Sequence, residues 1–175
     1  MELTFSIAET RDAPALVAMQ NRVNEDLSLR YPGGPWQPNA TERGMLFGMK
    51  HAKVLLALRG SEIAGMLRLQ TKKPWAIDIA YFTPAKKAIY LTGMAVDPGF
   101  QGKGVGSAML VEAVRVARDW PADAIRLDAY DREGGAGRFY ARNGFVHRGR
   151  AVYRNNPLVY FEMVFSPVAD RKAHE

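Results

Sequence analysis

A run of apolar residues that leads through a glycine-rich loop into a helix constrains this chain more than any other feature. The apolar run, A-I-Y-L-T-G-M-A-V at 88–96, is typical of a buried central strand. The loop D-P-G-F-Q-G-K-G-V-G follows at 97–106, and a mostly apolar helix is predicted at 104–118. A strand that passes directly into a helix in this way predicts an α/β domain.

The loop has the composition of an anion-binding site. Gly102, Gly104 and Gly106 allow the backbone to approach a bulky ligand and to reach positive φ. The first N–H groups of the helix lack partners, and the helix dipole adds positive character there. With the charge of Lys103, these groups suit a diphosphate. Taken alone, a loop of this composition is more often a turn that only begins a helix.

Two well-known phosphate-binding loops do not match. A P-loop requires G-x-x-x-x-G-K-[ST], but Lys103 precedes a glycine, and Asp97 stands where the first glycine belongs. A dinucleotide fingerprint requires G-x-G-x-x-G, and Ser107 occupies the third glycine position.

The rest of the chain alternates between strand and helix patterns. Strands are predicted at 3–8, 53–58, 63–71, 88–96, 124–130, 146–153 and 158–165, the last two joined by a hairpin around 155–157. Helices are predicted at 11–30, 41–50, 104–118 and 136–143. Segments 31–39 and 72–87 are rich in proline and aromatic residues and are predicted to be irregular. This order mixes hairpins with crossovers, so we expect a mixed sheet in an α/β fold.

Composition sets the remaining limits. The chain has 175 residues, of which 47% are hydrophobic, and we expect one domain at 1–165 and a tail at 166–175. The absence of cysteine excludes disulfides and cysteine chemistry, and no metal site is predicted. The net charge of +6 favours anionic partners, but the basic residues are scattered, so nucleic acid is not expected. No apolar run suits a membrane span and no signal peptide is evident, which predicts a cytoplasmic protein without membrane contact.

Two segments resemble a known family. Gln101, Gly104 and Gly106 fit the pattern Q/R-x-x-G-x-G/A, preceded by A-V-D-P at 95–98. A-G-R-F-Y-A-R-N-G-F at 136–145 fits A-x-x-F-Y-x-x-x-G-F. Both patterns, in this order, resemble the GNAT superfamily of acetyl-CoA-dependent N-acetyltransferases. The resemblance implies that family's fold over residues 3–165, with about seven strands, four helices and splayed central strands. It also implies direct attack of an amine on acetyl-CoA in a ternary complex.

The resemblance implies a role for individual residues. The Met94 N–H would donate to the thioester carbonyl, the Val96 backbone would contact the pantetheine arm, and the loop N–H groups would bind the diphosphate. Tyr140 would protonate the leaving thiolate, although a tyrosine pKa of about 10 lies above a thiol pKa of about 8.5. Glu133 stands where the family often has an asparagine, whose contact could pass to Arg138. The implied cofactor-binding residues are Met94, Ala95, Val96, Gln101, Gly102, Lys103, Gly104, Val105, Gly106, Ser107, Glu133, Arg138 and Tyr140.

The acceptor side is less constrained by the sequence. Many family members place a glutamate on the central strand as general base, but none is present in I-Y-L-T-G-M. Asp128 is the first candidate for the base, ahead of Glu162, Tyr90 and His147, and each could instead be a surface or paired strand residue. An aromatic acceptor pocket is predicted, although the same residues could form a lid packed on the sheet. Its predicted residues are Tyr31, Trp36, Trp75, Asp78, Tyr81 and Phe82.

Three functions remain open at this point. The first is acetylation of a small-molecule amine, which the aromatic segment at 72–87 favours slightly. The second is acetylation of a protein lysine or N-terminal amine, which needs an open groove. The third is a non-catalytic acyl-CoA-binding module, because no base is obvious. A homodimer is also left open.

Overall fold

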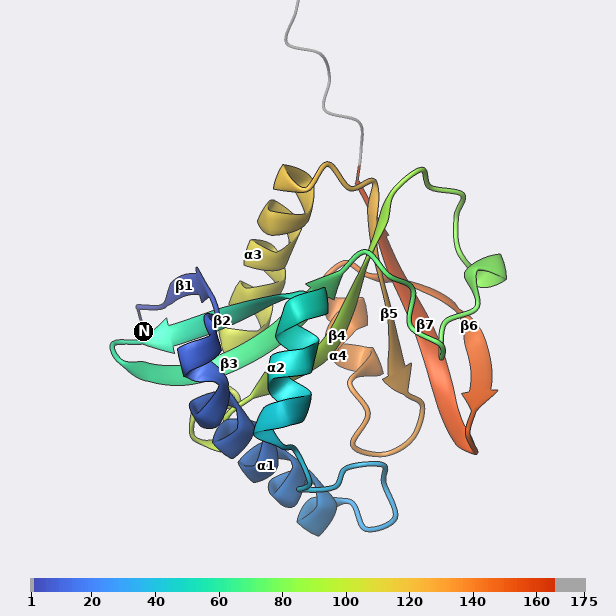
Figure 1. Cartoon of the computed structure of the whole chain (residues 1–175). Helices are drawn as coiled ribbons and strands as arrows, with labels where there is room; N and C mark the ends of the chain where they lie inside the picture. Colours follow the sequence, from blue (N-terminus) through green and yellow to red (C-terminus); the bar gives the residue numbers. More distant parts are fainter. Residues whose placement is uncertain (1, 166–175) are drawn as a thin grey trace, which may run out of the picture.

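The computed structural model describes residues 2–165, so the tail predicted at 166–175 lies outside it. One seven-stranded sheet, in the order β1-β2-β3-β4-β5-β7-β6, runs through these residues (Figure 1). Its strands are β1 (Thr4–Ile7), β2 (Lys53–Arg59), β3 (Glu62–Gln70), β4 (Ala88–Val96), β5 (Ala124–Tyr130), β6 (Val146–Tyr153) and β7 (Asn156–Val164). The β4–β5 pair is parallel and the others are antiparallel, so the predicted mixed sheet is confirmed.

Two helices lie on each face of the sheet. They are α1 (Ala13–Arg30), α2 (Glu42–His51), α3 (Val105–Asp119) and α4 (Gly137–Arg142). The α1 and α2 helices pack on β2 and β3 through one apolar cluster, whereas α3 and α4 cover the opposite face through a larger one (Figure 1). The predicted element order is therefore confirmed along the described chain.

Local sequence explains where the helices begin. Pro14 lies in the first turn of α1, where a missing N–H does no harm. The Thr41 side chain accepts a hydrogen bond of 3.2 Å from the Gly44 N–H and so caps α2. On α3 the polar residues Glu112, Arg115 and Asp119 form one stripe, in which Arg115 pairs with both acidic residues.

The sheet opens between β4 and β5. These strands pair only from Ala88 to Tyr90 on β4, while β5 stays paired with β7 along its whole length. Beyond Tyr90, β4 has no partner on its β5 side, and a bulge at Gly93 and Met94 bends it. Gly93 has a φ of +57°, which a glycine adopts without strain. The splayed central strands are thus confirmed, and the bulge adds to their divergence.

The segment at 72–87 packs over the sheet as an irregular excursion with one short 3-10 turn, Ile79–Tyr81. Its residues Ile77 and Phe82 are buried in a small cluster with Tyr90 and Tyr160. The segment is therefore a cover for the β7 side of the sheet, and its irregularity was correctly predicted.

The closing hairpin turns earlier than expected. Arg154 and Asn155 have positive φ values of 48° and 66°, as a two-residue hairpin turn requires. Asn156 and Pro157 already belong to β7. The turn predicted around 155–157 is therefore displaced, because the left-handed conformation falls on Arg154 and Asn155 and not on the proline.

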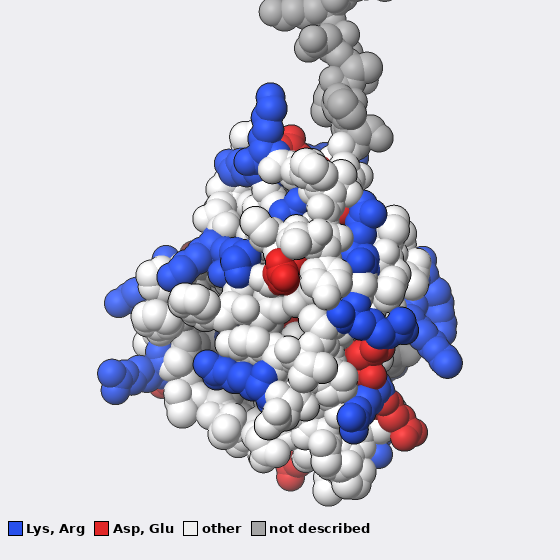
Figure 2. Space-filling view, turned by 90° about the vertical axis from the view of Figure 1, so that its right-hand side faces the viewer, with Lys and Arg blue, Asp and Glu red and all other residues white. Residues whose placement is uncertain are grey.

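The surface agrees with the scattered charge of the sequence. Lys and Arg side chains are spread over the face seen in Figure 2, interspersed with acidic ones and separated by uncharged surface. None of the described helices combines the length and apolarity that a membrane crossing requires.

Candidate active site

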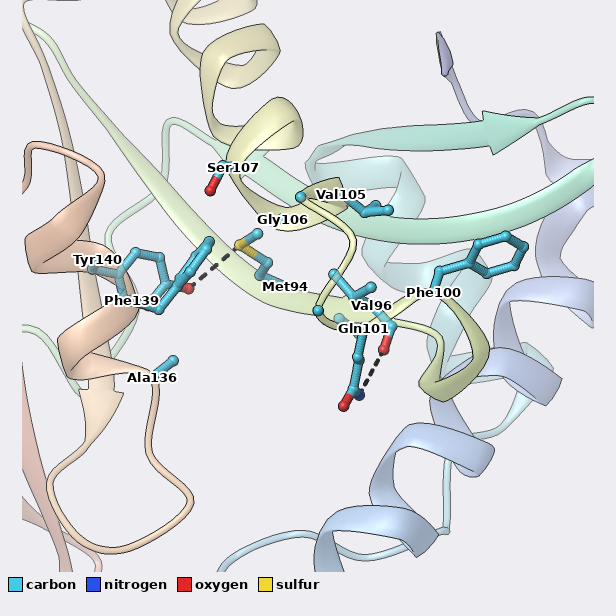
Figure 3. Close-up of a pocket in the computed structure, with 13 residues that line it drawn as sticks. Met94, Val96, Phe100, Gln101, Val105, Gly106, Ser107, Ala136, Phe139 and Tyr140 are labelled. Carbon is cyan, nitrogen blue, oxygen red and sulfur yellow. Dashed lines mark hydrogen bonds between the residues drawn. The ribbon is translucent and has the colours of Figure 1, made fainter. Parts of the chain in front are cut away.

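Two adjoining cavities lie where β4 leaves β5. The first, here called the loop-side cavity, has a volume of about 400 Å³ and lies between the end of β4, the glycine loop and α4 (Figure 3). The second, the α1-side cavity, has a volume of about 390 Å³ and lies between α1, β4 and β5. The residues that line both are Met94, Ala95, Val96, Gln101, Ala136 and Tyr140. The two cavities therefore form a single cleft, which passes the open end of β4 and connects the two faces of the sheet.

The glycine loop presents unpaired main-chain donors to this cleft. Gly102 and Gly104 have φ values of +71° and +81°, and a Cβ at either would meet only open space. The α3 helix then begins at Val105. No backbone N–H from Gly102 to Ser107 donates to another residue within 2–165. Because unpaired amides at a helix N-terminus attract anions, this loop fits a diphosphate.

Two side chains of the loop stabilise the loop's conformation through hydrogen bonds to main-chain carbonyls. Gln101 donates from Nε2 to the Val96 carbonyl at 3.0 Å, which occupies one of the Val96 backbone groups predicted to meet the pantetheine arm (Figure 3). Lys103 turns back to the Gly99 carbonyl at 2.8 Å and does not line the cavity. The positive character of the cleft wall therefore comes from main-chain amides more than from Lys103.

The loop-side cavity also contains residues that were not predicted to line it. Phe100, Ala136 and Phe139 contribute apolar surface. A Cβ at Gly106 would lie 3.0 Å from the Phe139 ring, so this glycine allows α3 and α4 to approach closely. Ala136 and Phe139 belong to the 136–145 motif, and their position in that motif was the available signal.

Tyr140 reaches the junction of the two cavities. Its ring is 6% exposed, and its hydroxyl donates to the Met94 sulfur at 3.6 Å (Figure 3). Burial raises the pKa of Tyr140 well above its ordinary value, and the charge of Asp128 raises it further. Tyr140 therefore stays protonated and acts as a hydrogen-bond donor, and it is a weaker acid than an exposed tyrosine.

Asp128 lines the α1-side cavity on β5. Burial raises its pKa, partly offset by a hydrogen bond from its own backbone. No ion pair or hydrogen bond links its carboxylate to another side chain among the described residues. A partly buried carboxylate with a raised pKa and an open cavity before it has the properties of a general base.

The other base candidates lie elsewhere. Glu162 is 1% exposed and is held by Arg126 at 3.0 Å and Arg148 at 2.8 Å. Burial tends to raise the pKa of Glu162, but hydrogen bonds from Arg126, Thr83 and Arg148 outweigh it and lower the pKa. Tyr90 is buried in the cluster under 72–87, and His147 is exposed on β6.

The predicted aromatic pocket divides into two groups. Trp36 lines the α1-side cavity and packs against Tyr31 and edge-on against Tyr130, with ring centroids 6.0 Å and 5.4 Å away. The second group lies outside both cavities; its members are Trp75, Asp78, Tyr81 and Phe82. Trp75 is 83% exposed, whereas Phe82 is buried against Tyr160. Of the six predicted residues, only Trp36 lines the cleft, and Tyr31 packs behind it without lining either cavity.

Other positions differ from the sequence interpretation or were missed by it. Glu133 and Arg138 are exposed and line neither of the two cavities; they border an adjoining depression that shares Gly134 and Gly135 with the α1-side cavity. The α1 helix contributes Gln20 and Asn24 to the α1-side cavity, where they share a hydrogen bond of 3.0 Å. Their spacing along a helix gave no signal that distinguishes them from other surface residues.

Comparison with known proteins identifies the family of this chain. The acetyltransferase (GNAT) family model matches residues 21–145, and the chain belongs to this family. Acetyltransferases are acyltransferases, and acetyl-CoA is the cofactor of the family. The family and cofactor predictions are thus confirmed.

Individual relatives are more distant. An uncharacterized N-acetyltransferase of Mycobacterium tuberculosis is 30% identical over 66 residues, which cover 38% of this chain and 42% of that protein. The matched stretch thus spans less than half of that relative.

Solved structures share the fold over nearly the whole chain. An acetyltransferase of the GNAT family from Streptococcus pneumoniae is 21% identical, covers 94% of this chain and 100% of its own, and has a TM-score of 0.70. The PaiA N-acetyltransferase of Thermoplasma acidophilum, solved with coenzyme A, is 14% identical with a TM-score of 0.72, covering 94% and 100%. The ribosomal-protein-S18-alanine N-acetyltransferase of Escherichia coli is 16% identical with a TM-score of 0.70, covering 99% and 100%.

Proposed function

We propose that the protein transfers an acetyl group from acetyl-CoA to a primary amine of a small molecule. The observation that carries the proposal is the continuous cleft, with unpaired amides from Gly102 to Ser107 at one end and Asp128 at the other. Tyr140 lies where the two parts meet.

The cofactor end of the cleft supports binding through the main chain. The amides of Gly102 to Ser107 bind the diphosphate, and the Met94 N–H in the β4 bulge donates to the carbonyl oxygen. One preorganised donor at such an oxygen lowers the barrier by roughly 2.7–4 kcal/mol. Acetyl-CoA would supply the electrophilic carbonyl carbon, and coenzyme A would leave as its thiolate.

The residues at the junction handle the protons. An alkylammonium with a pKa of about 10.4 costs roughly 4.6 kcal/mol to deprotonate at pH 7. The Asp128 carboxylate accepts that first proton and passes it to solvent. As the nitrogen–carbon bond forms and the carbon–sulfur bond breaks, the second amine proton is transferred to the coenzyme A sulfur. Tyr140 donates a hydrogen bond to that sulfur and orients it, because its raised pKa makes full proton transfer uphill.

The shape of the acceptor end favours a small molecule. The α1-side cavity is bounded by Trp36, by α1 and by the glycines 134 and 135 of the β5–α4 loop. A Cβ at Gly134 would lie 2.6 Å from the Tyr31 ring, so this loop and the 31–39 segment are in close contact. That contact narrows the groove that an extended peptide would need.

The test is release of thiol from acetyl-CoA with panels of polyamines, aminoglycosides, amino acids and peptides. Release that depends on a small amine supports the proposal. Release with peptides alone would assign the protein acceptor instead. Binding of coenzyme A without release in any panel would leave an acyl-CoA-binding module, and no binding by calorimetry would overturn the cofactor site itself.

A further inference from the structure

Arg68 on β3 carries a charge that nothing in the described chain balances. No ion pair within residues 2–165 involves it, and its buried Nε has no hydrogen-bond partner. Its Nη2 reaches only the Met45 sulfur, at 3.3 Å, and sulfur is a weak acceptor. Arg126, by contrast, is buried but pairs with Glu162 at 3.0 Å. Because a cation that is partly removed from water without a partner destabilises a fold, Arg68 needs an explanation beyond packing.

The Arg68 guanidinium lies beside the floor of the α1-side cavity. Arg68 pairs with Thr92 on β4, and Thr92 and Gly93 line that cavity. A Cβ at Gly93 would lie 3.7 Å from Nε and Nη1 of Arg68, and one at Gly48 of α2 would lie 3.4 Å from its Cζ. The guanidinium therefore lies between the bulge and α2, and the missing Cβ atoms of two glycines leave room for it there.

Arg68 and Asp128 are on the same face of the sheet, on either side of Thr92. Tyr90 pairs with Arg126, and a step of two residues along each strand brings Thr92 level with Asp128. Neighbouring strands are about 4.8 Å apart, so β3 and β5 are separated by about 10 Å or slightly more at the splay. The two side chains therefore start from backbones about 10 Å apart, and the long Arg68 side chain crosses part of that gap by extending over Gly93 of β4.

Given the acetyl transfer proposed above, on which this inference rests, we propose that Arg68 binds a carboxylate of the acceptor, so that the acceptor is a short amino acid. Its amine points to Asp128 and the open end of β4, and its carboxylate points to Arg68. A guanidinium with unused donors forms the paired hydrogen bonds that a carboxylate accepts.

The test compares acids with amines that lack only the carboxylate. Thiol release is measured with leucine against isoamylamine, phenylalanine against phenethylamine, and the remaining common amino acids against their decarboxylated amines. We expect at least one acid to exceed its amine in kcat/KM. Arg68→Met should reduce that value by about 10- to 100-fold, as loss of a charged hydrogen bond does, and leave the amine unchanged. Arg68→Lys should restore part of the preference.

The control is Arg43→Met, which removes an exposed arginine of α2 and should change neither substrate. Arg68→Met should fold with an unchanged or higher Tm, since it removes a desolvated charge. If Arg68→Met does not fold, Arg68→Gln takes its place in the same measurements. The inference would be overturned if the unmodified protein had the same kcat/KM for every acid and its amine. It would also be overturned if Arg68→Met lowered kcat/KM equally for both.

A binding measurement separates this inference from the proposed function. Calorimetry measures the binding of leucine, phenylalanine and the other panel acids to the protein loaded with coenzyme A. Free coenzyme A carries no acetyl group, so no transfer takes place during the measurement. If no amine releases thiol but an acid binds in an Arg68-dependent way, acetyl transfer fails and the carboxylate site stands. If binding is absent or independent of Arg68, the carboxylate site is wrong.

Discussion

At the scale of single residues, the Tyr140 hydroxyl is the group whose contribution can be isolated most cleanly. Its ring packs against Phe145 and Phe161, with centroids 5.7 Å and 6.1 Å away, and Tyr140→Phe keeps those contacts. The hydroxyl meets only the Met94 sulfur, so the protein should still fold and bind coenzyme A. We expect turnover to fall about 100-fold, the lower range for a group assisting proton transfer.

Steady-state thiol release with an identified amine measures this effect. Tyr153→Phe, near the β6–β7 turn and outside both cavities, is the matched control. Unchanged turnover in Tyr140→Phe would remove the hydroxyl from the mechanism.

Asp128 should combine high catalytic importance with a small stability penalty. Its folded pKa is raised by burial, so its contribution to stability is complete below the ordinary value of about 3.9 and is lost as pH rises through the raised value. Asp128→Asn should therefore match or exceed the unmodified protein in Tm at pH 7, and the difference should vanish at low pH. Turnover should drop by about 10²–10⁴-fold.

Thermal unfolding across pH and thiol release at pH 7 test both parts. Asp119→Asn, on the exposed stripe of α3, should leave turnover unchanged. A lower Tm of Asp128→Asn at pH 7 would mean that the carboxylate has a stabilising partner.

At the scale of elements, the glycine loop can be compared with a turn of the same conformation. Gly104 and Gly60 have φ values of +81° and +59°, and a Cβ at either would touch nothing within 4 Å. Alanine at either position should thus reduce stability by a similar amount, about 1–2 kcal/mol for the left-handed conformation. Only Gly104→Ala should also weaken coenzyme A binding, because only that loop lines the cleft.

Urea unfolding and calorimetry on both variants separate strain from binding. Equal coenzyme A affinities in Gly104→Ala and Gly60→Ala would argue against the loop as the diphosphate site.

The charged contacts of Glu162 hold the excursion at 72–87 onto the sheet. Glu162 pairs with Arg126 and Arg148 and accepts a hydrogen bond of 3.2 Å from the Thr83 N–H. Glu162→Gln leaves the buried Arg126 without a counter-charge, which should cost about 3–5 kcal/mol. Since its folded pKa is lowered, the Glu162 contribution is present above the ordinary value of about 4.3 and is lost as pH falls through the lowered value.

Urea unfolding at several pH values measures the loss, which should shrink under acid conditions. Glu112→Gln, in an exposed pair on α3, should show little change. The folded fraction of Glu162→Gln should keep its turnover, and a selective loss of turnover would return Glu162 to the list of base candidates.

At the scale of the whole molecule, cofactor binding should stabilise the complete fold. The loop-side cavity is formed by β4, the glycine loop, α3 and α4, so coenzyme A bound there should hold the central strand and two helices together. At a concentration about 100 times its Kd, coenzyme A should add about 2.7 kcal/mol to the free energy of unfolding and raise Tm by several degrees.

Thermal unfolding with increasing coenzyme A tests this linkage. NADH carries a diphosphate but no pantetheine arm, so it should stabilise the protein less at the same concentration. No shift with coenzyme A would contradict the cofactor assignment.

The sequence alone determined the order of the elements and the position of the glycine loop. Both depend on local information: the spacing of apolar residues, the prolines and glycines, and the run from Gln101 to Gly106. These features act within one element or between neighbours, so no knowledge of distant contacts is needed to read them.

Only the tertiary structure decided which side chains share the cleft. Trp36 and Asp128 lie far apart in the chain but line one cavity, whereas Trp75 and Phe82 do not reach it. The unpaired state of Arg68 likewise depends on α2, β3 and the β4 bulge together. Burial and pairing are properties of contacts between distant segments, and a single sequence specifies those contacts only through the folded chain.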